Sequence, residues 1–73
     1  KLYQVLEVFP WNIKFLRKYV RKHNIGELII KTRGFPQSSE KLLQQFKLKG
    51  TSKMTIIITR IGSSHQVAVL EQF

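Results

Sequence analysis

The stretch from Asn12 to Phe35 constrains the fold more than any other part of this sequence, because a helical pattern passes directly into a strand pattern. On a helix of 3.6 residues per turn, one side carries Ile13, Leu16, Val20 and His23, with Tyr19 on its flank. Asn12 is a suitable N-cap, and the pair Asn24–Ile25 followed by Gly26 allows a tight exit near His23. The stretch therefore predicts an amphipathic helix followed closely by a strand over residues 27–33.

The other side of this helix carries only positive charge. No acidic residue interrupts its cations, which are Lys14, Arg17, Lys18, Arg21 and Lys22. Like charges four residues apart destabilise a helix by about 0.2–0.5 kcal/mol per pair. A face of one sign therefore favours an anionic partner that carries phosphates, and a merely solvated surface is the alternative.

The composition points the same way. Among 73 residues, 13 are Lys or Arg and 4 are acidic, which gives a formal net charge of +9 and favours a polyanionic partner. A chain of this length makes one domain, residues 1–73. Cysteine is absent, which suits an intracellular protein, and the apolar runs are too short for a membrane-spanning helix. We expect an intracellular protein without a membrane partner.

The order of elements predicts the fold class. Strand patterns cover residues 2–9, 27–33, 53–61 and 66–71, and helical patterns cover residues 12–23 and 38–50. The segment 62–65 is short enough only for an antiparallel hairpin. The order β-α-β-α-β-β predicts an α/β (α+β) two-layer sandwich, with a four-stranded mixed sheet and both helices on one face.

This arrangement leaves one face of the sheet without helices. If the strand alternation holds, that face carries Ile29, Lys31, Arg33, Thr55, Ile57 and Thr59. Such a face is more apolar than water-exposed surfaces usually are, which indicates a docked neighbour. We expect Ile29 and Ile57 to be exposed in the isolated domain.

The turn after the second strand, residues 31–36, is a second candidate site. Lys31 and Arg33 project to one side, the following helix N-terminus favours an anion, and Phe35 offers a stacking surface for a base. The equally weighted alternative is that Phe35 folds into the core and that Arg33 pairs with a glutamate.

The residues give little support for a catalytic site or a metal-binding site. His23 and His65 are the only histidines, and without cysteine or aspartate they are too few for a zinc site. No close pair of carboxylates, P-loop or G-x-G-x-x-G motif occurs. We therefore predict no catalytic, metal-binding or cofactor-binding residues in this chain.

Five short motifs are distinctive when taken together: P-W-N-I-K at 10–14, I-G at 25–26, I-K-T-R-G at 30–34, L-K-G at 48–50 and I-T-R-I-G at 58–62. In this combination the sequence resembles the THUMP-like C-terminal domain of bacterial class I S-adenosylmethionine-dependent methyltransferases. The resemblance implies that the chain is a C-terminal piece of a longer cytoplasmic enzyme, whose methyltransferase domain precedes Lys1. S-adenosylmethionine is then the cofactor of the parent enzyme and not of this piece. The element order is also similar to that of the C-terminal domain of a bacterial translation initiation factor.

The resemblance implies a non-catalytic domain that binds the RNA substrate, tRNA or rRNA, because THUMP domains proper are RNA-binding modules. The helix cations would contact phosphates, and Lys31, Arg33 and Arg60 would add a second contact. The alternative is a structural domain that packs its uncovered sheet face on the methyltransferase domain and binds no nucleic acid.

Overall fold

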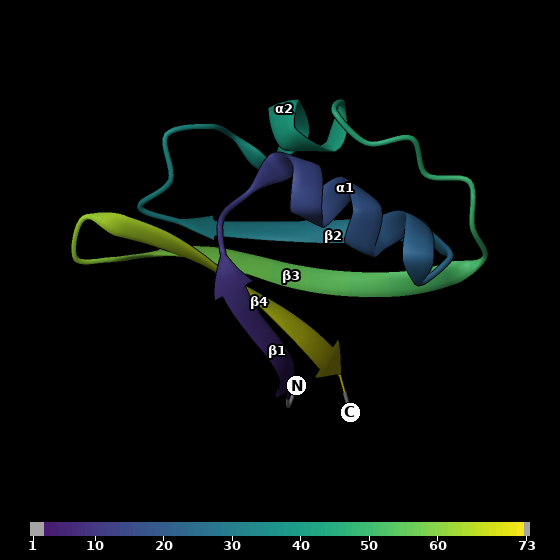
Figure 1. Ribbon diagram of the computed structural model, residues 1–73, viewed down its shortest axis with the longest axis horizontal. Helices are drawn as coiled ribbons and strands as arrows, with labels where there is room; N and C mark the ends of the chain where they lie inside the picture. The colour runs from purple at the N-terminus through teal and green to yellow at the C-terminus, as the bar shows by residue number, and fades with distance from the viewer. Residues whose placement is uncertain (1–2, 73) are drawn as a thin grey trace.

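The computed structural model describes residues 3–72 and has the predicted order of elements. These are β1 (Tyr3–Pro10), α1 (Ile13–Lys22), β2 (Ile25–Arg33), α2 (Ser39–Leu43), β3 (Ser52–Ile61) and β4 (Ser64–Gln72). The strands form one four-stranded sheet in the order β1-β4-β3-β2, with both helices on the same side (Figure 1). The prediction of a mixed sheet covered by two helices on one face is confirmed.

The sheet is mixed because β4 runs antiparallel to both of its neighbours, whereas β2 and β3 are parallel. β3 and β4 form the expected hairpin, in which Ile61 pairs with Ser64 across a two-residue turn. Gly62 opens that turn with φ of 63°, a conformation that glycine adopts without strain. At the other end of β4, Gln72 is the register partner of Tyr3, so the two ends of the described chain lie side by side.

Local chemistry defines α1. The Asn12 side chain caps the helix by accepting a hydrogen bond from the Phe15 backbone N–H at 3.1 Å. The helix ends at Lys22, with His23 as its C-cap, and Asn24 then takes the left-handed backbone conformation with φ of 56°. Both predicted ends of this helix are therefore confirmed.

The core lies between the helices and the sheet. Its residues are apolar side chains with at most 9% exposure: Leu16, Val20, Ile25, Leu28, Ile30, Leu42, Phe46, Met54, Ile56, Ile58, Val67 and Val69. Leu28 and Ile30 alternate with outward-facing residues along β2, as the strand period predicts.

The second helix is much shorter than predicted. It ends at Leu43, and the turn that follows is tightened by bonds from the Gln45 N–H to Leu42 O and from the Phe46 N–H to Leu43 O. Residues 46–49 have no regular structure. An extended chain advances about 3.3 Å per residue, against about 1.5 Å in a helix, so this segment can return along β2 to reach Ser52, the partner of Ile25.

Two glycines permit a close chain crossing at the end of this return. The backbone N–H groups of Thr51 and Ser52 both donate to Asn24 O at 3.0 Å. A side chain at Gly50 would overlap the Asn24 carbonyl, and a side chain at Gly26 would overlap the Gly50 carbonyl. The segment before β3 is therefore held against the segment after α1 at backbone distance.

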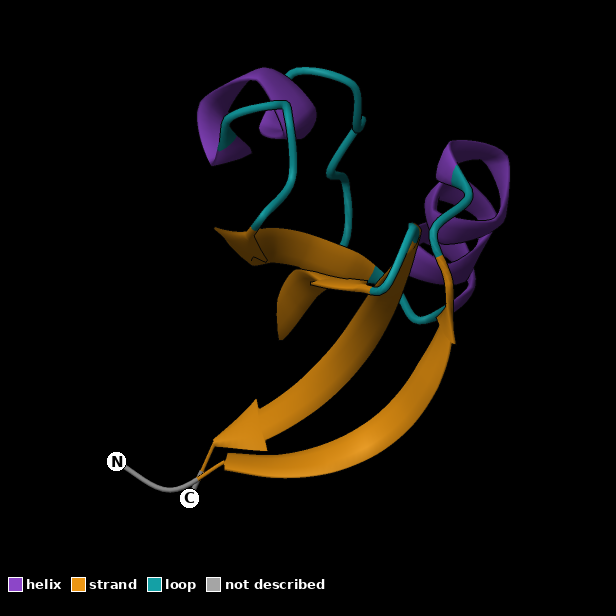
Figure 2. Cartoon of the chain, turned by 90° about the vertical axis from the view of Figure 1, so that its left-hand side faces the viewer, coloured by secondary structure: helices purple, strands orange, loops and turns teal. Residues whose placement is uncertain are grey.

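The face without helices is concave. Figure 2 shows that β1 and β4 bend away from the helices, so that their far ends pass under this face. Ile29 and Ile57 are partly exposed there, which confirms the predicted faces of β2 and β3 although not full exposure. Thr55 lies on the same face and is only 6% exposed, because the curved sheet encloses its centre.

Candidate nucleic-acid interface

The predicted basic face exists on α1. Its five cations, Lys14, Arg17, Lys18, Arg21 and Lys22, are all exposed. Within residues 3–72 the ion pair found is Lys53–Glu27 at 3.6 Å, and none of the helix cations pairs with a carboxylate. The face therefore keeps its full positive charge for an external anion.

Arg17 differs from its neighbours because it also has a structural role. Its Nε donates to Gln45 O at 3.0 Å and ties α1 to the turn after α2. A guanidinium has five N–H donors, so this bond fixes the orientation of the group and leaves other donors for a ligand.

A groove runs between α1 and residues 44–50. One part, of about 400 Å³, is lined by Val20, Arg21, Asn24, Ile25, Lys47, Lys49 and Gly50. A second part, of about 280 Å³, is lined by Arg17, Val20, Arg21, Gln45, Phe46 and Lys47. Three shared residues, Val20, Arg21 and Lys47, make the two parts continuous.

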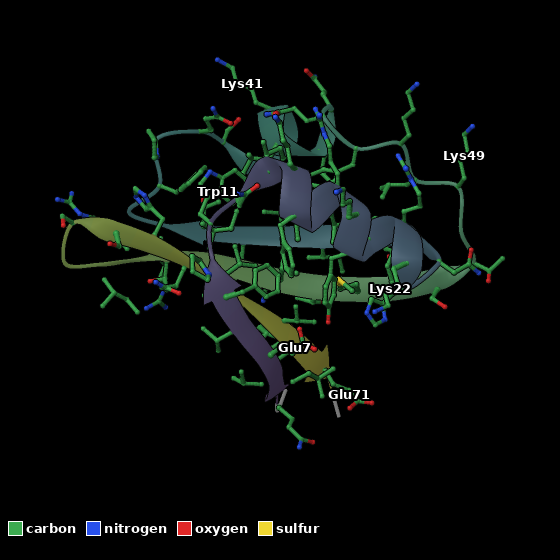
Figure 3. The ribbon with its side chains drawn as sticks, in the orientation of Figure 1. Glu7, Trp11, Lys22, Lys41, Lys49 and Glu71 are labelled. Atoms are coloured by element: carbon green, nitrogen blue, oxygen red, sulfur yellow. The ribbon has the colours of Figure 1, made fainter. Side chains whose placement is uncertain are left out.

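Sequence reasoning missed the lysines of this groove. The sequence pattern predicts a helix over residues 38–50, which includes Lys47 and Lys49, whereas these lysines lie on the irregular segment before β3. Figure 3 shows Lys49 and Lys22 near the same end of the molecule, on this segment and on α1. The available signal was the K-L-K pattern: in an extended chain Leu48 packs on the core while both lysines face outward.

Lys31 lies apart from the helix cations, on the concave face of the sheet. Its Nζ is 3.2 Å from the Tyr3 hydroxyl and 4.8 Å from the centre of the Tyr3 ring. The residue thus has a partner within the protein, on the opposite edge strand.

The turn after β2 forms a third location. Phe35 packs between Trp11 and His65, with ring centres 4.9 and 5.0 Å away and near-perpendicular planes. His65 Nε2 lies 3.2 Å from Gly34 O and fixes the other side of the turn. The packing alternative therefore describes the Phe35 ring in this structure, and a base contact by Phe35 stays a prediction.

Two arginines flank this turn. Arg60 Nε donates to Gly62 O at 2.9 Å, which holds its side chain beside the hairpin. Arg33 is exposed, and within residues 3–72 it forms no ion pair with a glutamate. The nine predicted residues thus occupy three places: the outer face of α1, the concave sheet face, and the end of β2 and β3.

The surroundings of Tyr19 shift the pKa of its phenol. Burial raises the pKa of the Tyr19 phenol above its ordinary value of 10.0, and the charge and hydrogen bonding of the nearby Glu7 carboxylate raise this pKa further. The phenol is therefore neutral at physiological pH and belongs to the packing between α1 and β1.

Other kinds of site find no support in the described part of the chain. Among residues 3–72, no group of three or more potential metal ligands comes together. No helix in the same range has the length and apolar character needed to cross a bilayer.

Comparison with known proteins identifies a matching family and a solved structure with a similar fold. The family model described as "THUMP domain-like" matches residues 1–72. A crystal structure of a "putative methyltransferase from Porphyromonas gingivalis W83" has a similar fold, with a TM-score of 0.65 and 22% identity over 93% of this chain. The chain spans 16% of the length of that protein. No curated protein sequence matches.

Proposed function

This chain belongs to the THUMP domain-like family, and from that premise we propose that it is a non-catalytic domain that binds RNA for a methyltransferase. The observation that carries the proposal is the α1 face, where five exposed cations have no carboxylate partner among residues 3–72. Unneutralised Lys and Arg on one face are the electrostatic footprint of nucleic-acid binding.

The contacts in this proposal are made to phosphates. Each Lys or Arg that neutralises a phosphate releases condensed counterions, so affinity depends strongly on salt and little on sequence. Three residues at the end of β2 and β3 are candidates for an additional contact: Arg33, Phe35 and Arg60. Lys31 lies on the concave face of the sheet, which is the face opposite the helices.

The parent enzyme belongs to the same proposal. The fold similarity to a protein described as a methyltransferase supports a methyltransferase domain beside this one, with S-adenosylmethionine as its cofactor. The RNA substrate would be tRNA or rRNA in the cytoplasm, by analogy with THUMP domains proper. In this arrangement the present chain positions the RNA, and the neighbouring domain supplies the chemistry.

The test is RNA binding by the 73-residue chain across a series of salt concentrations. Lys14→Gln with Lys18→Gln removes two cations from the face of α1 without touching the Arg17–Gln45 contact or the groove. We expect weaker binding of unrelated RNAs and a salt slope smaller by about 0.7–0.9 per lost contact. Absence of RNA binding by the unaltered chain at low salt would refute the proposal.

A structural docking domain is the second candidate. The apolar side chains Val5 and Val8 on β1 are 55% and 60% exposed, and they lie in register with Leu70 and Ala68 of the concave face. Such exposed apolar area is typical of a surface covered by another domain. This candidate leads if the chain binds no RNA and if Val5→Ser with Val8→Ser weakens its association with the methyltransferase domain.

A further inference from the structure

We infer that the groove between α1 and residues 44–50 clamps the backbone of one RNA strand, with Arg17 and Arg21 on one wall and Lys47 and Lys49 on the other. The inference rests on the proposed RNA-binding function and deepens it: it identifies a two-walled phosphate site, where the sequence indicated only a helix face. Cations on two facing walls can contact both non-bridging oxygens of one phosphate. Cations on a single helix face approach the phosphate from one side and contact fewer of its oxygens.

The wall that carries the lysines is held in place at both ends. At one end, Gln45 O accepts the hydrogen bond from Arg17 Nε at 3.0 Å. At the other, the Gly50 N–H donates to Ile25 O at 3.3 Å, next to the glycine crossing. Leu48 packs on the core between the two lysines. The lysines therefore stand on an anchored segment, which lowers the entropy cost of binding a ligand.

The free groove is electrostatically unfavourable. Four cations line it and no acidic side chain lines either part. Like charges repel one another within the screening length, which is about 10 Å at 0.1 M salt. Bound phosphates would relieve this repulsion. Without an anion, the repulsion among these cations lowers the stability of the protein. A purely structural role therefore explains the arrangement less well than anion binding does.

The lining also limits the ligand. Val20 and Ile25 form an apolar floor that suits ribose carbon atoms and offers no hydrogen bonds to base edges. Among the uncharged residues that line the larger part, Asn24 has the polar side chain. The groove therefore fits a sugar–phosphate backbone without sequence preference. With a volume of about 400 Å³, the larger part is too small to enclose a duplex, so it can enclose only the backbone of one strand.

The experiment compares two double variants of the 73-residue chain that remove the same charge. Lys47→Gln with Lys49→Gln alters the groove. Lys41→Gln with Lys53→Gln is the control of equal charge outside it, in which the exposed Lys53–Glu27 ion pair is also lost. The probes are fluorescently labelled poly(U) and a poly(A)·poly(U) duplex. For poly(U) we expect the groove variant to flatten the salt slope by about 1.4, which is two single-strand contacts at about 0.7 each. The control should flatten it by less than half as much.

A double-mutant cycle tests whether the two walls share a phosphate. Arg21→Gln and Lys47→Gln should together weaken poly(U) binding less than the product of their separate effects, because each removes a contact to the same group. Thermal unfolding of every variant is the control for folding, and we expect these exposed substitutions to change the melting temperature only slightly.

The outcomes separate this inference from the proposed function. A groove variant that binds poly(U) like its control, while Lys14→Gln with Lys18→Gln still weakens binding, overturns the groove and leaves RNA binding by α1 standing. Tighter binding of the duplex than of poly(U) also overturns the one-strand groove. An unaltered chain that binds neither probe at low salt overturns both.

Discussion

Lys31 and Tyr3 stand on opposite edge strands of the sheet, yet the Lys31 Nζ lies 3.2 Å from the Tyr3 hydroxyl. Their side chains meet across β3 and β4 because the uncovered face is concave (Figure 2). Thr55, on the same face, is only 6% exposed. The curvature of the sheet therefore gives the exposed Lys31 a partner within the chain and separates it from the cations of α1.

This contact should contribute only modestly to stability. Tyr3→Phe removes the hydroxyl acceptor while the ring remains, and an exposed pair of this kind is worth less than about 1 kcal/mol. We expect a loss of that size in the free energy of unfolding, measured by urea denaturation. Lys31→Met should give a similar loss, and a loss above about 2 kcal/mol in either variant would show that the contact organises the whole face.

Two isoleucines of β3 provide a matched test of the core. Ile58 has no exposed surface, whereas Ile61 is 62% exposed on the same strand. Ile58→Val should lower the free energy of unfolding by about 0.5–1.5 kcal/mol, because it leaves a small cavity in the packed layer. Ile61→Val should change it by less than about 0.5 kcal/mol. Equal effects in urea denaturation would contradict the assignment of faces on β3.

The glycine crossing gives a sharper prediction. Gly50→Ala places a methyl group against the Asn24 carbonyl, so the two segments must separate. We expect a loss of about 1–3 kcal/mol in the free energy of unfolding, the usual cost of overpacking. The lysine wall should also move, which would weaken binding of poly(U).

Gly62→Ala is the control for this glycine. Its methyl group would enter open space, although its φ of 63° still disfavours alanine by about 1–2 kcal/mol. We expect Gly62→Ala to lower stability and to leave poly(U) binding unchanged. Weaker RNA binding in both variants would trace the effect to general destabilisation.

The phenol of Tyr19 should make stability depend on pH in alkaline solution. Burial, supported by the Glu7 carboxylate, raises the pKa of Tyr19 above 10.0 in the folded state. The folded protein then holds this proton more tightly than the unfolded chain. The stability that this bound proton contributes is fully present below pH 10. This contribution is lost as the pH rises through the folded-state pKa of Tyr19.

Phenolate absorbance measures this titration directly. In a Tyr3→Phe background Tyr19 is the remaining tyrosine of the chain. Glu7→Gln in that background should lower the pKa of Tyr19, because it removes the negative charge while burial persists. An unchanged titration would assign the whole shift to burial.

Local chemistry explains why α1 could be predicted so well. The Asn12 cap, the left-handed Asn24 and the separation of apolar and basic faces all depend on residues within a few positions of one another. The alternation along β2 and β3 is equally local, and it gave the correct faces for Ile29 and Ile57. Such signals survive in the fold because tertiary contacts agree with them.

The sequence-based predictions fail where contacts between residues far apart in the chain determine the structure. The end of α2 depends on the path back to Ser52 beside Ile25, and no residue near Leu43 encodes that path. The groove follows from the same path. The K-L-K pattern of residues 47–49 indicates an extended segment with two outward lysines, but it does not say which element they face. The choice between packing and exposure for Phe35 depends on Trp11 and His65, which approach it only in the folded chain.

The pairing of Tyr3 with Gln72 makes the domain suitable for circular permutation. A short flexible linker would join the two ends, and new termini could open at Gly62, where the hairpin turn meets open space. The permuted chain would keep α1 and residues 44–50 uninterrupted. Its ends would then emerge beside Arg60, at the carboxyl end of β2 and β3, so a fluorophore or a surface tether attached there would leave the groove free.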